Sequence, residues 1–180
     1  MQVSESVVKF LEKEDIRFSQ LDDKTIYRVG FEGKSGTFVM YIDIDEERGH
    51  IECVTICPLR AAEDTTAEVL KLFAHLNWRL ATGHFDIDCN EGDIRFRVGL
   101  FAGSSELDHE MIRHLVLVGI SSMDMFIPII ASVIYGKVGA EDALSMHTKR
   151  ASKNADTKAS DGQVSGFGGR LGGIMDGSNN

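Results

Sequence analysis

Basic residues are scarce in this 180-residue chain, and their scarcity limits the partners that the chain can bind. Nineteen lysines and arginines stand against 28 aspartates and glutamates, which gives a formal net charge of −9. Binding to nucleic acid needs a basic patch that neutralises phosphates, and an anionic membrane surface attracts the same kind of patch. The composition therefore argues against both partners, whereas it suits solubility or a basic protein partner.

The few basic residues gather near the end of the chain. Residues 149–180 hold five basic side chains against three acidic ones, a net charge of +2, so residues 1–148 carry −11. The same segment lacks proline but is rich in Gly, Ser, Asn, Asp and Lys, which is typical of a flexible tail. We expect one domain over residues 3–147, long enough to bury a real core, and a flexible tail over residues 148–180.

Cysteines are also few. Cys53, Cys57 and Cys89 are odd in number and lack the tight spacing of a metal site. Cys53 and Cys57 lie four residues apart on an expected strand, about 13 Å at the usual rise per residue, so they cannot bind one ion alone. The six histidines form no His-x-x-x-His pair. We expect free thiols, no metal, no cofactor and, because the N-terminal residues lack the pattern of a secretory signal, a cytoplasmic protein.

The sequence holds no set of groups arranged for catalysis. A Gly-Lys-Ser run at residues 33–35 resembles the end of a phosphate-binding loop, but that motif needs a glycine where this chain has Arg28. We expect a hairpin turn there instead. Asp86 and Asp88 are candidates for a catalytic carboxylate pair, but nearby arginines give them ready ion-pair partners. We therefore predict no enzyme activity.

Three stretches rich in β-branched and aromatic residues predict strands. They are residues 25–31, 37–44 and 51–57, separated by glycine-containing turns. The simplest arrangement is a three-stranded antiparallel meander, and residues 16–21 before it are ambiguous. The middle strand is apolar at every position from 38 to 42, which predicts that something packs on each of its faces.

Apolar residues recur at helical spacing in three places. The first helix is predicted over residues 3–14, with Ser4 or Ser6 as its N-cap. The second starts at a capping-box pattern in residues 65–68, in which the threonine and the glutamate cap the helix start reciprocally. The third follows Asp108, which is its expected N-cap, and residues 140–146 predict one further short turn.

Residues 115–134 form an apolar stretch as long as a membrane span, with Asp124 as the only charged residue. Three serines and Pro128 interrupt the stretch. Because proline lacks an amide N–H and clashes with the preceding turn, we expect a kink or restart at Pro128. The sheet also needs a helix to cover its apolar face. We therefore expect a buried or interface helix and no membrane span.

Strict alternation of apolar and charged residues predicts a hairpin over residues 85–100. Directly opposed residues share a face of the sheet. A two-residue loop at positions 91–92 sets Asp86 opposite Arg97 and Phe85 opposite Val98, so that one face is apolar and the other carries charge pairs. A three-residue loop would set aspartates opposite apolar residues, and is therefore rejected.

These elements together predict an α+β fold in the order αβββαββα. The sheet is mainly antiparallel, a three-stranded meander plus a hairpin, with helices flanking it. The predicted core consists of Phe10, Phe38, Met40, Ile42, Val54, Leu72, Phe73, Leu76, Phe85, Ile87, Phe96, Val98, Leu115 and Phe126.

Trp78 is the only tryptophan and stands beside Arg79 at a predicted helix end. Tryptophan at such a position anchors either a core or an interface. We take Trp78, Arg79, Met40 and Phe126 as candidate partner-binding residues. The surplus of apolar surface predicts self-association, for which closed two-fold dimers are the commonest form.

Five short segments give the chain a resemblance to the YbjN-domain family of bacterial proteins, over about residues 4–146. The resemblance implies a fold like that of the small acidic chaperones of type III secretion, dimers that hold unfolded segments of partner proteins. It also implies a role in regulating bacterial sensory transduction. The family offers no catalytic residues to carry over, and the glycine-rich tail departs from its pattern. The segments are residues 38–44 (FVMYIDI), 76–80 (LNWRL), 83–88 (GHFDID), 94–98 (IRFRV) and 141–144 (EDAL).

The sequence therefore predicts a non-catalytic protein-binding module, chaperone-like or regulatory, that forms a homodimer and binds a protein partner. The acidic body, the abundant apolar surface and the lack of a catalytic constellation support this prediction. A small-molecule-sensing regulatory domain is the alternative, and an enzyme of unknown reaction comes third.

Overall fold

The chain folds into one antiparallel sheet with helices on one side of it. The computed structural model describes residues 2–21, 25–103 and 107–147, so the predicted tail over residues 148–180 lies outside the described residues. The predicted α+β fold is confirmed, with one strand more before the meander and a last helical segment at residues 140–147. The elements are α1 (Val3–Lys13), β1 (Phe18–Gln20), β2 (Ile26–Glu32), β3 (Thr37–Asp45), β4 (His50–Arg60), α2 (Glu63–Arg79), β5 (His84–Ile87), β6 (Asp93–Phe101) and α3 (His109–Ile134).

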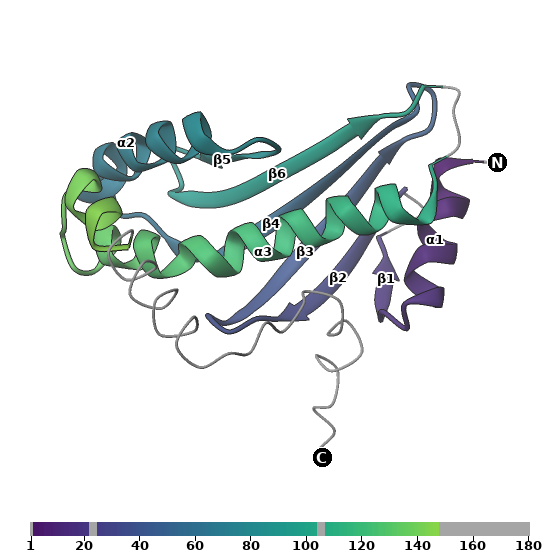
Figure 1. Cartoon of the computed structure of the whole chain (residues 1–180), viewed down its shortest axis with the longest axis horizontal. Coiled ribbons are helices and arrows are strands. Elements are labelled where there is room, and N and C mark those ends of the chain that lie inside the picture. Colours follow the sequence, from purple (N-terminus) through teal and green to yellow (C-terminus); the bar gives the residue numbers. More distant parts are fainter. Residues whose placement is uncertain (1, 22–24, 104–106, 148–180) are drawn as a thin grey trace, which may run out of the picture.

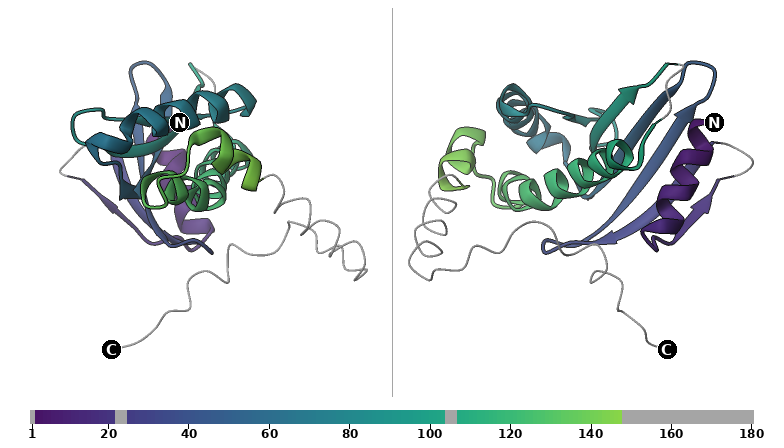
Figure 2. Two further views of the ribbon diagram at one scale, coloured as in Figure 1. Left: turned by 90° about the vertical axis from the view of Figure 1, so that its left-hand side faces the viewer. Right: turned by 45° about the vertical axis from the view of Figure 1, so that its right-hand side comes forward.

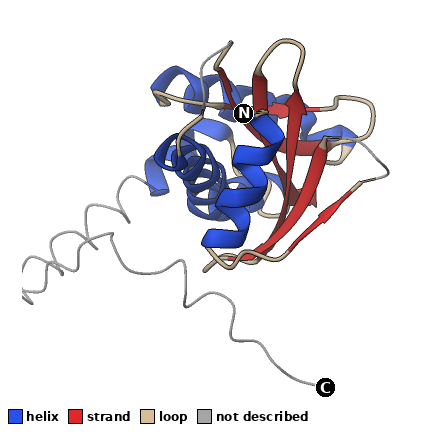
Figure 3. Cartoon of the chain, turned by 90° about the vertical axis from the view of Figure 1, so that its right-hand side faces the viewer, coloured by secondary structure: helices blue, strands red, loops and turns tan. Residues whose placement is uncertain are grey.

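The six strands lie in the order β1-β2-β3-β4-β6-β5, and every neighbouring pair is antiparallel. The predicted hairpin thus joins the predicted meander through β6, which pairs with β4. α3 runs across the sheet, and α1 and α2 lie at its two ends (Figures 1 and 2). The opposite face of the sheet carries no helix (Figure 3). The middle strand β3 is therefore covered on one face only, unlike the prediction that something packs on both.

β4 is longer than the predicted strand and continues through Pro58 to Arg60. Proline removes a ladder hydrogen bond and is tolerated inside a sheet mainly at edges and bulges. In this chain it lies where the pairing between β4 and β6 shifts register, between Ile56 and Arg60. The irregularity explains why the proline does not end the strand.

The core lies between the sheet and α3. Most of the predicted core residues are buried there, but Ile87 and Phe126 are only half-buried and pack at its margin. Val54 was placed in the core wrongly. Its neighbours Cys53 and Thr55 are fully buried, and because strand side chains alternate between faces, Val54 lies on the helix-free face.

α1 is capped from a distant turn, not by Ser4 or Ser6 as predicted. Its N-cap is Gln2, whose side chain makes no capping hydrogen bond. Instead the Glu46 carboxylate accepts from the backbone N–H groups of Val3 and Ser4, at 2.9 and 2.7 Å. These are two of the donors that a helix start leaves unpaired. Glu46 belongs to the acidic β3–β4 turn, and its carboxylate fastens α1 to the sheet.

Replacement of Glu46 by glutamine should cost about 1 kcal/mol at pH 7, the usual value of a helix cap. Partial burial raises the pKa of Glu46, but hydrogen bonds from Ser4 and Val3 outweigh it and hold that pKa below its ordinary value. A lowered folded-state pKa stabilises the protein above the unfolded-state pKa, and the stabilisation is lost as pH falls through the folded value. Urea denaturation at pH 7, 5, 4 and 3 should therefore show the gap between wild type and Glu46→Gln closing in acid. A gap that stays constant over this range would contradict the capping role.

α2 begins earlier than predicted, and the expected capping box does not form. Its N-cap is Ala62, and the Thr65 hydroxyl accepts from the Ala62 N–H at 3.1 Å. Glu68 acts elsewhere: its carboxylate accepts from the backbone N–H of Ala140, at the start of the helical residues 140–147. The carboxylate thus caps a different helix, and with the Lys137–Asp64 ion pair at 2.9 Å it fastens the end of the described chain to α2.

α3 begins at the predicted cap, since the Asp108 side chain accepts from the N–H of Met111. The predicted restart at Pro128 does not occur, because α3 is one helix from His109 to Ile134. Proline leaves the carbonyl of Asp124, four residues earlier, without its helical partner. The Ser35 hydroxyl donates to this carbonyl at 2.7 Å, and the Ser35 N–H donates to the Asp124 carboxylate at 2.6 Å. The Gly-Lys-Ser run is thus a hairpin turn, as predicted, and it docks on the helix at the proline.

Replacement of Ser35 by alanine should cost about 1 kcal/mol, because the Asp124 carbonyl then loses its partner. In a Pro128→Ala background the new N–H at position 128 can bond this carbonyl within the helix. The same Ser35→Ala change should there cost less than about half as much, a coupling that a double-mutant cycle by urea denaturation measures. Equal costs in the two backgrounds would show that the hydroxyl does not compensate for the proline.

Candidate protein-binding surfaces

The helix-free face of the sheet carries a compact apolar cluster at its centre. Val39 pairs with Ile56, and Tyr41 pairs with Val54, across β3 and β4. All four side chains are half-buried, although no helix covers them. We call these four residues the apolar quartet.

Three arginines and one glycine flank the apolar quartet on the neighbouring strands. On β2, Arg28 lies opposite Tyr41 and Gly30 opposite Val39. On β6, Arg95 and Arg97 lie opposite Ile56 and Val54. A Cβ atom added at position 30 would meet nothing within 4 Å, so the face has an open place beside Val39.

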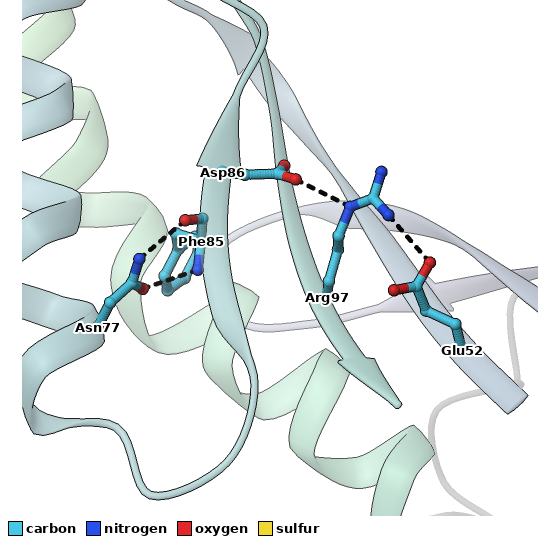
Figure 4. Close-up of polar contacts among 5 residues, drawn as sticks. All are labelled: Glu52, Asn77, Phe85, Asp86 and Arg97. Atoms are coloured by element: carbon cyan, nitrogen blue, oxygen red, sulfur yellow. Dashed lines mark hydrogen bonds and ion pairs between the residues drawn. The ribbon is translucent and has the colours of Figure 1, made fainter. Parts of the chain in front are cut away.

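Arg97 is the arginine whose charge is neutralised within the chain. Its Nε lies 2.8 Å from the Asp86 carboxylate and its Nη1 donates to the Glu52 carboxylate at 3.0 Å (Figure 4). Neither Arg28 nor Arg95 forms an ion pair with another described residue. Asp86 lies opposite Arg95 on β5, and the positive charge of Arg95 adds to the backbone hydrogen bonds from Asn90 and Glu91 that lower the pKa of Asp88, so acidic as well as basic groups border the quartet.

The predicted pairing of the β5–β6 hairpin has the right faces but the wrong partners. Phe85 lies opposite Phe96, not Val98, and Asp86 lies opposite Arg95, although its carboxylate reaches diagonally to Arg97. The loop holds four residues, 89–92, because the backbone N–H of Asp88 bonds the carbonyl of Asp93 at 2.9 Å. The shift is two residues, which preserves the face of every side chain.

Asp88 is a loop-forming residue and not half of a carboxylate pair. Its side chain accepts from the backbone N–H groups of Asn90 and Glu91, at 2.9 and 3.2 Å. These hydrogen bonds hold the pKa of Asp88 below its ordinary value. Asp86 forms an ion pair with Arg97. The two aspartates therefore have separate roles: Asp86 pairs with an arginine, and Asp88 stabilises the hairpin loop.

Asn77 protects the edge of the sheet at β5. Its side-chain oxygen accepts from the Phe85 N–H at 2.8 Å, and its side-chain nitrogen donates to the Phe85 carbonyl at 2.9 Å (Figure 4). The amide of Asn77 therefore replaces a neighbouring strand at this edge. Strand edges with unpaired backbone groups invite association with other chains, and this contact, which the sequence pattern did not reveal, blocks one.

The outer side of α2 carries a second apolar surface. Ala67, Leu70, Ala74 and Trp78 recur at spacings of three or four and so lie along one side of the helix, opposite the buried residues Val69, Leu72, Phe73 and Leu76. Trp78 is 90% exposed and Leu70 is 44% exposed. We call the four residues the α2 stripe.

The structure separates the four residues that the sequence suggested for partner binding. Trp78 and Arg79 are exposed at the end of α2. Met40 is fully buried, and Phe126 packs edge-on against Phe85 with ring centroids 5.6 Å apart. Met40 and Phe126 therefore pack in the interior. Of the four candidates, only Trp78 and Arg79 lie where a partner can reach them.

Among the described residues, no group of three or more His, Cys, Asp or Glu side chains is placed to hold a metal ion. Burial raises the pKa of Cys53 to about 12 and that of Cys57 to about 11, so both are neutral thiols at pH 7 and poor nucleophiles. The hollow at the start of α2 is open and is lined by Ala62, Glu63 and Asp64. None of these places encloses a small molecule.

α3 is long and apolar enough to span a membrane by length and composition alone. The central helix of a soluble protein meets the same criterion. In this chain one side of α3 packs against β3, β4 and β6, and less than half of its most apolar stretch is buried. The helix thus covers the sheet, as the sequence predicted.

Comparison with known proteins shows the family and the fold. A family model described as "Putative bacterial sensory transduction regulator", the YbjN family, matches residues 4–131. None of the curated proteins matches the sequence.

Three solved structures share the fold at low sequence identity. The crystal structure of YbjN from E. coli, described as "a putative transcription regulator", is 11% identical with a TM-score of 0.53, over 69% of this chain and 87% of that one. The HopA1–SchA chaperone–effector complex is 12% identical with a TM-score of 0.50, over 66% of this chain and 88% of that one. The ExsC–ExsE complex is 13% identical with a TM-score of 0.51, over 69% of this chain and 90% of that one. With the family model covering most of the described residues, this chain belongs to the YbjN family.

Proposed function

We propose that this chain is a non-catalytic protein-binding module, chaperone-like or regulatory, whose partner binds the helix-free face of the sheet. The observation that carries the proposal is the apolar quartet, which lies at the centre of a face that no helix covers. Uncovered apolar surface ringed by polar groups is typical of interaction sites. The cytoplasm is the proposed location.

The comparisons support a role in binding proteins. The family is described as "Putative bacterial sensory transduction regulator", and one of the structures with this fold is a complex of a chaperone with its effector. Chaperone-like holding of a partner segment and regulation by binding both require a surface such as the quartet.

To test this proposal, a large side chain is introduced at Gly30, the open position on the helix-free face, so that it blocks the binding of a partner. Gly30→Trp places an indole beside the quartet, and because an added Cβ atom at this position meets nothing within 4 Å, the backbone leaves room for the side chain and the variant should fold with an unchanged melting temperature. His114→Glu, at an exposed position on α3, is the control. A stoichiometric protein partner that co-purifies with wild type and with the control, but not with Gly30→Trp, is expected. A co-purifying metabolite without a protein would favour the small-molecule sensor instead.

We further propose that the chain forms a homodimer through the α2 stripe. The stripe alternates small and large side chains, Ala67, Leu70, Ala74 and Trp78. In an antiparallel two-fold pairing, Trp78 therefore packs on the partner subunit's Ala67, and Leu70 packs on the partner subunit's Ala74. Small residues also let two helix backbones approach closely. The acidic first turn of one helix then lies beside Arg79 at the basic end of the other, which adds charge complementarity.

Ala74→Glu tests the dimer, because glutamate is a good helix former and position 74 is exposed. The variant should keep its melting temperature in the monomer and shift the dimer toward monomer in sedimentation equilibrium at tens of micromolar. His114→Glu adds the same charge elsewhere and should leave the dimer intact. A wild-type protein that is monomeric at this concentration would refute the proposal.

A further inference from the structure

We infer that the outer edge of β6 over residues 98–101 binds an extended segment of a partner protein, which joins the sheet as a further strand in line with β5. We call residues 98–101 the free edge. This inference rests on the proposed function only in that the partner is a protein, because the free edge is a different surface from the helix-free face.

The backbone of β6 alternates between the strands on its two sides. In an antiparallel ladder, successive residues direct their N–H and C=O groups to opposite neighbours. The Ala102 N–H donates to the Gly49 carbonyl at 2.8 Å, so every second residue before Ala102 bonds β4. Gly99 and Phe101 are the residues between, and their N–H and C=O groups therefore point to the side on which β5 lies.

No described strand pairs with the free edge on that side. β5 pairs with β6 only from Ile94 to Arg97, and β6 runs on past the end of β5 (Figure 1). The hydrogen bonds among the described residues include none to the outward backbone groups of Gly99 and Phe101. The N–H and C=O groups of both residues are therefore available to an added strand.

The chain turns away from the free edge at both ends. Gly83, just before β5, has a φ of 76°, and a Cβ atom there would lie 2.5 Å from the ring of Phe96 on the helix-covered face. The chain thus departs from the line of β5 at this point. After β6, Gly103 lies against Gly49 in the β3–β4 turn, which is on the side away from β5.

The free edge lacks the features that keep strand edges from pairing with other chains. Natural edges are very short, or carry charges, prolines or bulges. Asn77 blocks the edge at β5, and the opposite edge strand β1 has only three residues. The free edge reads Val-Gly-Leu-Phe, without charge or proline, and Phe101 is 69% exposed. One unguarded apolar edge in an otherwise guarded sheet indicates a strand that pairs there.

The part of α3 that runs beside the free edge is apolar on the same side. A Cβ atom at Gly119 would lie 3.9 Å from Val98, so the helix before Gly119 lies alongside the free edge. Met111 and Val118, seven residues apart, share one side of this helix; Met111 is 46% exposed and Val118 is half-buried. The added strand should therefore carry apolar side chains at alternate positions, facing α3.

An extended segment fits the free edge better than a second copy of this chain does. Two copies paired edge to edge would share only the free edge of each, a contact roughly 13 Å long at the usual strand rise. A stable dimer buries about 800 Å² on each partner, which so short a contact does not supply. An extended segment gains the same backbone hydrogen bonds and also packs on α3, which is the usual form of strand addition to a sheet edge.

The experiment selects phage-displayed random twelve-residue peptides on the full-length protein and measures the binding of synthetic copies by fluorescence anisotropy. Phe101→Pro removes one outward N–H and no bond to β4, and proline is tolerated at such edge positions. Phe101→Ala removes the same side chain but keeps the N–H. Peptides with alternating apolar residues should be enriched, and they should bind Phe101→Pro about tenfold more weakly than Phe101→Ala.

Methylation of the peptide backbone tests the same pairing on the unchanged protein. A methyl group on a peptide nitrogen removes one N–H donor, and only alternate N–H groups of an added strand face β6. A scan of single N-methyl groups should therefore weaken binding at every second residue of the paired stretch. Met111→Glu, which places a charge beside the free edge, should weaken binding too, whereas Met146→Glu, at an exposed methionine elsewhere, should not.

The outcomes separate this inference from the proposed function. Peptides that bind Phe101→Pro as tightly as Phe101→Ala, but not Gly30→Trp, would keep the helix-free face as a binding site and overturn the free edge. An N-methyl scan without a period of two would overturn strand addition. A wild-type dimer that dissociates in Phe101→Pro but not in Phe101→Ala would assign the edge to a second copy instead. Failure to enrich any peptide on wild type over Phe101→Pro would also overturn the inference, while co-purification with Gly30→Trp decides the proposed function independently.

Discussion

Replacement of Gly119 by valine should lower the free energy of unfolding by about 2–3 kcal/mol, the upper range for overpacking a core. Gly119 is the point at which α3 approaches the sheet. A Cβ atom there would lie 2.6 Å from the Met40 methyl group and 2.9 Å from the Thr55 hydroxyl oxygen. Met40 and Thr55 are fully buried, so the two branches of valine find no room unless the helix moves away from β3 and β4.

Gly30→Val is the matched control for this prediction. It makes the same substitution on the other face of the sheet, where an added Cβ meets nothing within 4 Å. Valine also suits a strand better than glycine does, so Gly30→Val should leave stability unchanged or raise it slightly. Guanidinium denaturation of both variants measures the difference. Equal costs would show that the effect comes from backbone entropy and not from the close approach of α3.

The sequence predicted the elements and their faces well because both follow from local periodicity. Alternation in the β5–β6 hairpin correctly assigned Phe85 and Phe96 to the core and Asp86 and Arg97 to the opposite face. Alternation does not fix register, however, because a shift of two residues returns every side chain to the same face. The four-residue loop at Asp88 depends on hydrogen bonds from that side chain to the backbone, which periodicity does not report.

The caps show a second limit of the sequence pattern. The pattern assigned Ser4 or Ser6 to α1 and Glu68 to α2, since local capping motifs join residues a few positions apart. In the structure Glu46 caps α1 across 43 residues and Glu68 caps Ala140 across 72. A carboxylate can cap any helix start that the fold brings to it, so these contacts follow from the tertiary structure alone.

The candidate binding surface was predicted only in part, for the same reason. The apolar middle strand correctly indicated surplus apolar surface, but which of its residues face solvent depends on where the helices pack. Because all helices lie on one side (Figure 3), Val39 and Tyr41 are left for a partner while Met40 is buried. The border of Arg28 and Arg95 depends on the pairing of four strands, which a single sequence does not show.

No sequence pattern indicated the role of Asn77, and its replacement should be among the most costly. Asn77→Leu keeps the approximate size of the side chain but removes both hydrogen bonds to Phe85. At about 1 kcal/mol each, their loss should lower the free energy of unfolding by about 2 kcal/mol in urea denaturation. It also exposes the edge of β5, so light scattering should show concentration-dependent association into species larger than those of wild type.

Asn77→Asp tests the same contact by pH. The introduced carboxylate can still accept from the Phe85 N–H, but it faces the Phe85 carbonyl without a proton to donate, so the variant should be destabilised at pH 7. The unpaired carbonyl disfavours the charged form and should raise the pKa of the introduced carboxyl above the ordinary value near 4. For an acid whose folded-state pKa is raised, the destabilisation is full above that pKa and disappears as pH falls through it to the unfolded value. The protonated carboxyl then donates to the carbonyl as the amide does in wild type.

The difference in unfolding free energy between Asn77→Asp and wild type should therefore shrink between pH 7 and pH 4, while the difference for Asn77→Leu stays constant. If the two variants followed the same pH profile, the bond from the Asn77 amide to the Phe85 carbonyl would carry no stability.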